Sequence, residues 1–189
     1  MNLRCSLLLA CPLILLFGCD RKVNETTGQP PKTAGDEVTS SLKPILVEQK
    51  ITKVQMERTG CYGFCPVYEV DIDNNGTVNF NGITHIAMPG PHTRAAAQPD
   101  VDALISEIKR INFFKLKDSY RFMRDGCTSW ATDGPSVSIA VTQGDEIKHV
   151  VYYYGCTGFA AEQDLKSLAK SIDRVAKTKK WIGGRDKVL

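Results

Sequence analysis

The stretch over residues 59–68 constrains the fold more than any other part of the chain. It reads TGCYGFCPVY and holds two cysteines, two glycines, one proline and three aromatic residues. Cys61 and Cys65 are four residues apart, which predicts a tight corner closed by a disulfide or a metal ion. The glycines tolerate backbone angles that a side chain would penalise, and Pro66 stiffens the exit into the next segment. We therefore expect a covalent or metal-bound corner between two strands.

The N-terminus resembles a bacterial lipoprotein signal. Arg4 precedes an apolar run over residues 6–17, and Gly18-Cys19 then leads abruptly into a polar segment. The run is too short for an uncleaved membrane anchor, because a span takes about 20 apolar residues. We expect residues 1–18 to be a signal peptide that is removed. Cys19 would then be the mature N-terminus and carry the acyl chains, palmitate among them.

The residues after Cys19 predict a cellular location and a flexible tether. By resemblance to enteric lipoproteins, Asp20 at this position favours retention in the inner membrane, facing the periplasm. Residues 19–44 are rich in Thr, Gly, Pro, Lys and Ser and show no apolar period, so we expect a flexible tether with a reach of about 25–30 Å. A single folded domain is predicted over residues 45–182, followed by a C-terminal tail over residues 183–189.

Net charge limits the class of partner. The chain has 24 Lys and Arg against 21 Asp and Glu, and removal of Arg4 with the signal peptide leaves 23 against 21, a formal charge of +2. This small surplus argues against a dedicated polyanion binder, so no nucleic-acid partner is expected. The expected partners are the membrane, through the lipid anchor, and an envelope protein.

Four cysteines remain in the predicted mature domain, which is an even count in an oxidising compartment and favours two disulfides. A hairpin centred on Gly144-Asp145 would bring Cys156 beside the loop that contains Cys127. The favoured pairs are therefore Cys61–Cys65 and Cys127–Cys156. In the chain-entropy model the second bridge contributes about 3–4 kcal/mol, and the first, which closes a very short loop, contributes less.

Alternation of apolar and polar residues predicts six strands, and an apolar period of 3.6 predicts two helices. Gly82 is interpreted as a break between the third and fourth strands, and residues 118–135 as an irregular stretch. The expected strands cover 51–58, 67–73, 77–81, 83–88, 136–143 and 147–154, and the helices begin near Pro99 and Glu162 and end near Ile111 and Lys180. The order β-β-β-β-α-β-β-α indicates one α+β domain, with an antiparallel sheet and both helices on one face.

The block Cys61-Tyr-Gly-Phe-Cys-Pro-Val-Tyr68, followed by glycines at 76 and 82, resembles an uncharacterised bacterial family, a domain of unknown function. That family is marked by a Cys-x-Gly-x-Cys-Pro-x-Tyr corner before a Gly-turned hairpin, and it often follows a lipoprotein signal. The resemblance covers residues 51–175. It implies the fold and supplies no activity.

An alternative gives the corner a chemical role. Extracytoplasmic copper chaperones of thioredoxin fold use a Cys-x-x-x-Cys-Pro corner and a distant histidine, and soft thiolates suit Cu(I). Cys61 and Cys65 with His92 would be the ligands here, with the other histidines as substitutes, or the two thiols would perform disulfide exchange. The βαβ unit that presents such a motif is absent from the predicted element order. A structural zinc site made by all four cysteines fits the usual spacing for one pair only.

No motif in the sequence predicts a catalytic residue. There is no Ser-centred nucleophile elbow, phosphate-binding loop or HExxH helix. Tyr153 is expected to pack inward, which would leave Tyr152 and Tyr154 on the opposite face of the sheet. The leading hypothesis is a non-catalytic, membrane-tethered binding module without a cofactor, which contacts an envelope partner through the sheet face or the corner. The alternative is a copper-binding or thiol–disulfide protein.

Overall fold

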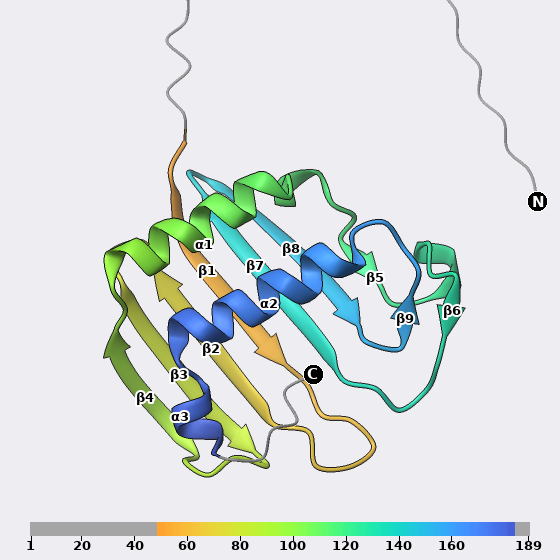
Figure 1. Cartoon of the computed structure of the whole chain (residues 1–189), viewed down its shortest axis with the longest axis horizontal. Helices are drawn as coiled ribbons and strands as arrows, with labels where there is room; N and C mark the ends of the chain where they lie inside the picture. The colour runs from red at the N-terminus through yellow and green to blue at the C-terminus, as the bar shows by residue number, and fades with distance from the viewer. Residues whose placement is uncertain (1–48, 184–189) are drawn as a thin grey trace, which may run out of the picture. The chain divides into compact units, whose positions relative to one another are not determined.

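The computed structural model describes residues 49–183. The predicted signal peptide, Cys19, the predicted tether and all but the first residue of the predicted tail lie outside the described residues. A seven-stranded sheet has the order β4-β3-β2-β1-β7-β8-β5, and a separate pair joins β6 to β9 (Figure 1). The strands are β1 (Ile51–Arg58), β2 (Val67–Asp73), β3 (Thr77–Thr84), β4 (Gly90–Ala95), β5 (Ser119–Tyr120), β6 (Ser129–Trp130), β7 (Ser136–Gln143), β8 (Glu146–Tyr153) and β9 (Cys156–Thr157).

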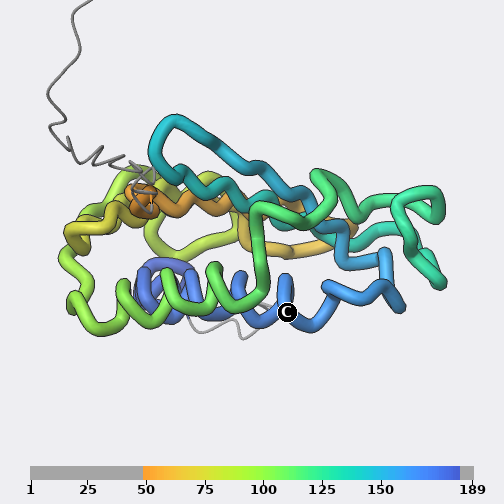
Figure 2. The backbone as a smooth tube through the Cα atoms, turned by 90° about the horizontal axis from the view of Figure 1, so that it is seen from above, coloured from red at the N-terminus to blue at the C-terminus, as the bar shows by residue number. Residues whose placement is uncertain are grey.

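The helices lie on one face of this sheet, as the perpendicular views show (Figures 1 and 2). They are α1 (Gln98–Arg110), α2 (Glu162–Ala176) and α3 (Lys179–Ile182), with two 3₁₀ turns at Phe113–Lys115 and Met123–Asp125. The core fills the space between the helices and the inward-facing strand residues. The predicted apolar stripe of α2 is buried as expected: Leu165, Leu168, Ala169, Ile172, Val175 and Ala176. The α+β class and the helices on one face are confirmed.

Hairpin connections explain why the sheet is antiparallel. The predicted turn after Asp73 joins β2 to β3, and Gly76 adopts a φ of 89° and donates its N–H to the carbonyl of Asp73 at 2.9 Å. A Cβ on Gly76 would also stand 2.8 Å from the carbonyl oxygen of Ala96, so glycine is required there for space as well as conformation. Among residues 49–183 the parallel pair is β5 with β8, and β5 lies near the start of the stretch over residues 118–135 that the sequence predicts to be irregular.

The predicted fourth strand over residues 83–88 is wrong. β3 continues through Gly82 to Thr84, and the fourth strand is Gly90–Ala95. Gly82 marks a close approach and not a break, because a Cβ there would lie 2.9 Å from the carbonyl oxygen of Met88. Because β4 is an edge strand, it accommodates Pro91, whose missing N–H can face away from the sheet.

The C-terminal helix also differs from its prediction. α2 ends at Ala176 because Lys177 adopts the left-handed conformation with a φ of 54°. The following turn, α3, buries Trp181 and Ile182 against the core. Of the predicted basic helix end, Lys177 therefore lies in the connection between the two helices, and Lys179 and Lys180 belong to α3.

Tyr153 does not pack inward. Val150 and Tyr152 face the core because they pair with the buried Ile139 and Val137 of β7. Tyr153 lies on the opposite side of β8, where its hydroxyl donates to the carbonyl of Ala131 at 2.7 Å.

Candidate functional site

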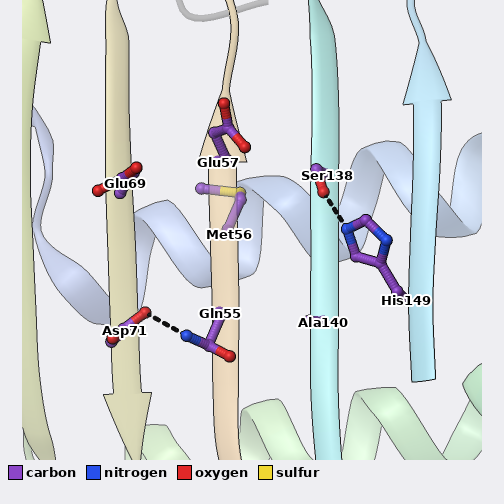
Figure 3. A pocket seen from close by; sticks show the side chains of 8 residues that line it. All are labelled: Gln55, Met56, Glu57, Glu69, Asp71, Ser138, Ala140 and His149. Carbon is purple, nitrogen blue, oxygen red and sulfur yellow. Dashed lines mark hydrogen bonds between the residues drawn. The ribbon is translucent and has the colours of Figure 1, made fainter. Parts of the chain in front are cut away.

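The face of the sheet away from the helices is the strongest candidate for a functional surface. No helix in residues 49–183 covers it (Figure 2). Because successive residues of a strand point to opposite faces, the polar residues between the buried Val54, Met56 and Arg58 all face outward. The central strands enclose a shallow depression of about 340 Å³ there. Its lining residues are Gln55, Met56, Glu57, Glu69, Asp71, Ser138, Ala140 and His149 (Figure 3).

The strand register sets these side chains in two rows across the sheet. Glu57 on β1 stands directly opposite Glu69 on β2 and Ser138 on β7. The next row places Gln55 between Asp71 and Ala140, and His149 follows on β8. Gln55 donates a side-chain hydrogen bond to Asp71 at 3.0 Å (Figure 3). The rows are therefore positioned by rigid backbone pairing and not by a loop.

Within residues 49–183, Glu57 and Glu69 have no ion-pair partner. Glu69 accepts a hydrogen bond from Asn81 Nδ2 at 3.1 Å, but neither glutamate forms an ion pair with any residue in the described part of the chain. The nearby Lys53 lies instead 3.9 Å from Asp71 and 3.5 Å from Asp73. Like charges directly opposite each other destabilise a sheet. This face is thus negative at its centre and has the electrostatics to attract a cation.

Ser138 and His149 form a side-chain hydrogen bond at the edge of the depression (Figure 3). A serine nucleophile needs a histidine that is itself oriented by a third group, and donors that stabilise an oxyanion. Within residues 49–183, no carboxylate is bonded to His149. The pair therefore lacks the third member of a catalytic triad in this structure.

The corner predicted from Cys61 and Cys65 is closed by a disulfide, with the two Cα atoms 5.6 Å apart. The backbone N–H of Tyr62 donates to the carbonyl of Asp133 at 3.0 Å, which fixes the corner to the loop before β7. Tyr62 and Phe64 project outward and are 89% and 71% exposed. The corner is therefore a rigid support that presents two aromatic rings to solvent.

Of the histidines named for the copper alternative, His85 contacts this corner, and His92 packs against Trp181. His92 stacks on Trp181 and its Nε2 lies 3.2 Å from the carbonyl oxygen of Met88. The histidine beside the corner is His85, whose Nδ1 lies 3.2 Å from the carbonyl oxygen of Cys65 and whose ring packs against Phe64. In the part of the chain that is described, no three His, Cys, Asp or Glu side chains form a group able to hold a metal ion.

The second disulfide joins Cys127 to Cys156, with the Cα atoms 5.2 Å apart. Both residues are buried, and the bridge holds β9 beside the loop that contains β6. The hairpin reasoning is reproduced closely: Tyr154 donates its N–H to the carbonyl of Pro135 at 3.0 Å, which brings the chain after β8 to this loop. The expectation that the domain contains disulfide bonds is confirmed.

A buried polar network lies on the helix side of the sheet, and no pattern in the sequence predicts it. Arg58 is 6% exposed and donates to Asp173 of α2 at 2.6 Å and to the hydroxyl of Tyr154 at 3.0 Å. Asp173 also accepts hydrogen bonds from the hydroxyls of Tyr68 at 2.6 Å and Thr178 at 2.9 Å. Arg58, Tyr68 and Tyr154 are about 100 residues from their partners in this network, so local patterns could not have predicted it.

The electrostatics of this network favour a charged pair. Burial, the largest influence, would by itself lower the pKa of Arg58, but the interactions with Asp173, Tyr68 and Tyr154 together outweigh it and raise that pKa. Burial raises the pKa of the Tyr68 hydroxyl, and the adjacent carboxylate of Asp173 raises it further. Both groups therefore keep their protons across the ordinary pH range. We assign the network to holding α2 against β1 and β2, because its polar atoms are used within the protein.

Residues 52–176 match a family described as a domain of unknown function, DUF6438. The chain belongs to the DUF6438 family. The matched region begins in β1, ends at the last residue of α2 and contains both disulfides and the open face. No curated protein matches the chain. The family match therefore identifies the domain but assigns it no activity.

No helix within residues 49–183 is long and apolar enough to cross a membrane.

Proposed function

We propose that this DUF6438 protein is a lipid-anchored, non-catalytic binding module of the bacterial envelope, and that its open sheet face binds a cationic segment of an envelope protein. The observation that carries the binding role is the direct opposition of Glu57 and Glu69 without an ion-pair partner in the described chain. Lysine or arginine side chains laid along the rows would relieve that repulsion. The depression is shallow and open, which suits an extended peptide.

The cellular location predicted from the sequence supports this proposal. Cys19 follows an apolar run of signal-peptide length, and two disulfides are typical of proteins that mature in an oxidising compartment. Asp20 favours the inner membrane, with the domain facing the periplasm. A tether of about 25 residues would place the domain about 25–30 Å from the bilayer, within reach of other envelope proteins.

The binding role is tested by titrating the purified protein with a tetralysine peptide in a calorimeter. We expect measurable binding that weakens with salt, since the attraction is between charges near the surface. The double variant Glu57→Gln/Glu69→Gln is expected to bind at least about tenfold more weakly, the equivalent of ~1.4 kcal/mol. A tetraglutamate peptide is expected not to bind.

The matched control removes two carboxylates outside the depression, in the variant Glu107→Gln/Glu146→Gln. It changes net charge by the same amount, so an equal loss of affinity in both double variants would show that only overall charge matters. That result, or tetralysine binding of equal strength in the wild type and in Glu57→Gln/Glu69→Gln, contradicts the proposal.

The anchor is tested separately. We expect the N-terminal peptide of protein isolated from the membrane fraction to begin at Cys19 and to carry acyl chains, as mass spectrometry would show. A Cys19→Ala variant is expected to lose the acyl mass. An unmodified Cys19 in membrane-bound wild-type protein would contradict the anchor while leaving the binding role of the sheet face open to its own test.

A further inference from the structure

The loop over residues 121–130, which we call the aromatic loop, presents an exposed apolar and basic tip. It reads RFMRDGCTSW. Phe122 is 38% exposed, Met123 58% and Trp130 44%. The guanidinium carbons of Arg121 and Arg124 lie 5.4 and 4.6 Å from the ring centroid of Phe122. Large apolar side chains and fixed positive charges therefore stand together at one end of the domain.

This tip is held rigidly although it contains little regular structure. One carboxylate oxygen of Asp125 accepts hydrogen bonds from the backbone N–H groups of Arg121 and Phe122 and from the hydroxyl of Ser119. The indole N–H of Trp130 donates to the carbonyl of Arg121 at 2.9 Å, so both ends of the loop are joined. The disulfide from Cys127 fastens it to β9. The apolar side chains are thus exposed by a constrained backbone, and they do not fold back into the core.

We propose that the aromatic loop inserts into the surface of an anionic lipid bilayer. A tryptophan with its ring partly in hydrocarbon is favoured at the membrane interface, and arginines beside apolar side chains can reach lipid phosphates while their stems stay buried. Asp125, the acidic residue of the loop, is occupied by its hydrogen bonds within the loop. The loop therefore offers apolar insertion together with positive charge, and both complement a surface rich in anionic headgroups.

The chain outside the described residues is long enough to permit this contact. The described part begins at Gln49, whose carbonyl accepts a hydrogen bond from Gln143 at the turn between β7 and β8. The aromatic loop lies beyond the opposite end of β8, an eight-residue strand, which spans ~27 Å at the usual rise. Residues 20–48 could extend over roughly 95 Å, several times that distance. Insertion extends the proposed lipid anchoring but does not require it.

Intrinsic fluorescence gives a direct test, because the chain has two tryptophans and Trp181 is buried at 4% exposure. The full chain is mixed with a large excess of vesicles whose acyl chains carry bromine, a quencher of tryptophan. We expect Trp130 emission to be quenched and shifted to shorter wavelength by vesicles containing one part phosphatidylglycerol to two parts phosphatidylcholine. Vesicles of phosphatidylcholine alone are expected to quench it less.

Three variants separate insertion from other causes. Trp130→Phe is expected to lose the quenching, and Phe122→Ser/Met123→Ser is expected to lose it in a folded protein that still shows the circular dichroism of the wild type. Arg121→Gln/Arg124→Gln is expected to remove the dependence on phosphatidylglycerol. The controls Ile147→Ser and Lys170→Gln, an exposed apolar and an exposed basic residue elsewhere, are expected to behave as the wild type.

Absence of quenching in the anionic vesicles overturns the proposal, as does quenching that survives in Phe122→Ser/Met123→Ser. Quenching that is equal in both lipid mixtures overturns the role of the arginines and with it the choice of an anionic surface. Flotation of the protein with the vesicles reports attachment through either the lipid anchor or the loop. A chain that floats without quenching is anchored but does not insert its loop, and a chain that is quenched in all but the Trp130 and loop variants inserts whether or not it is acylated.

Discussion

At the scale of single residues, Arg58 shows how this domain accommodates a buried charge. Its guanidinium, 6% exposed, is matched by the carboxylate of Asp173, which also receives the hydroxyls of Tyr68 and Thr178. A buried pair of this kind contributes little compared with an apolar replacement, but removal of one partner leaves an uncompensated charge. The network therefore determines how α2 docks more than how stable the domain is.

We expect Asp173→Ala to lower the free energy of unfolding by about 3–5 kcal/mol, because Arg58 would remain buried without a counterion. The double variant Arg58→Met/Asp173→Leu is expected to cost much less than the sum of the single variants. Urea denaturation monitored by fluorescence measures both. Additive losses would show that the two residues do not act as a pair.

The opposed glutamates predict a conflict between stability and binding. Glu57→Gln removes a like-charge repulsion with Glu69 across β1 and β2, so we expect it to stabilise the domain by roughly 0.2–1 kcal/mol while weakening the binding of a cationic peptide. Thermal denaturation at low salt measures the stability. A destabilised Glu57→Gln variant would indicate that Glu57 has a structural role instead.

At the scale of elements, the two disulfides close loops of very different length. Cys61–Cys65 closes a loop with a sequence separation of 4, whereas Cys127–Cys156 spans 29 residues. The entropy removed from the unfolded chain grows with loop length. The short bridge therefore mainly shapes the corner, and the long bridge fastens the aromatic loop and β9 to the sheet.

We expect Cys127→Ser/Cys156→Ser to lower the free energy of unfolding by about 3–4 kcal/mol and Cys61→Ser/Cys65→Ser by about 2 kcal/mol. Guanidinium denaturation of both double variants, in the absence of reductant, measures the difference. The reverse order of the two losses would show that loop closure is not what these bridges contribute.

The elements with strong periodic patterns could be predicted from the sequence, and the others could not. The apolar stripe of α2 and the turn at Gly76 follow from local residues. Local patterns do not predict β4, because Gly82 resembles a strand break in the sequence. In the structure Gly82 instead allows the backbone of Met88 to approach closely. The network around Asp173 was missed because its partners are up to 115 residues away in sequence.

The sequence predicts a solvent-exposed face of the sheet but not the arrangement of charges on that face. The acidic residues of β2 alternate in the sequence and predict a solvent-exposed face. The opposition of Glu57 to Glu69, by contrast, depends on strand register, which local patterns do not supply. The exposure of Phe122 and Met123 could likewise not be predicted, because the sequence around them shows no apolar periodicity.

At the scale of the whole domain, acid is expected to loosen the end that carries the aromatic loop. Hydrogen bonds from the backbone of Arg121 and the hydroxyl of Ser119 lower the pKa of Asp125, and the ammonium of Lys166 lowers the pKa of Glu162. A carboxylate with a lowered pKa contributes stability that is fully present above its ordinary pKa. That contribution disappears as the pH falls through the lowered value.

We therefore expect the melting temperature to fall as the pH drops below about 4, the ordinary range of Asp and Glu. The variant Asp125→Asn/Glu162→Gln is expected to melt lower at pH 7 and to show a flatter pH dependence. Calorimetric scans between pH 7 and pH 2 measure this. Parallel curves for variant and wild type would show that other carboxylates govern the acid response.

The two faces of the sheet differ in what covers them. The helices cover one face of the sheet, while the other face carries the acidic rows (Figures 2 and 3). The corner and the aromatic loop project rigid aromatic side chains outside that face. A fold of this kind can present a binding face while its disulfides keep the projecting loops in place.

An amide chemical-shift map of the protein titrated with a lysine-rich peptide tests directly whether the open sheet face binds cations. We expect the perturbed amides to lie in β1, β2, β7 and β8, around Glu57, Glu69 and Ser138, and we expect the amides of α1 and α2 not to move. Perturbations confined to the Cys61–Cys65 corner or the helices, or none at a peptide excess, would contradict it.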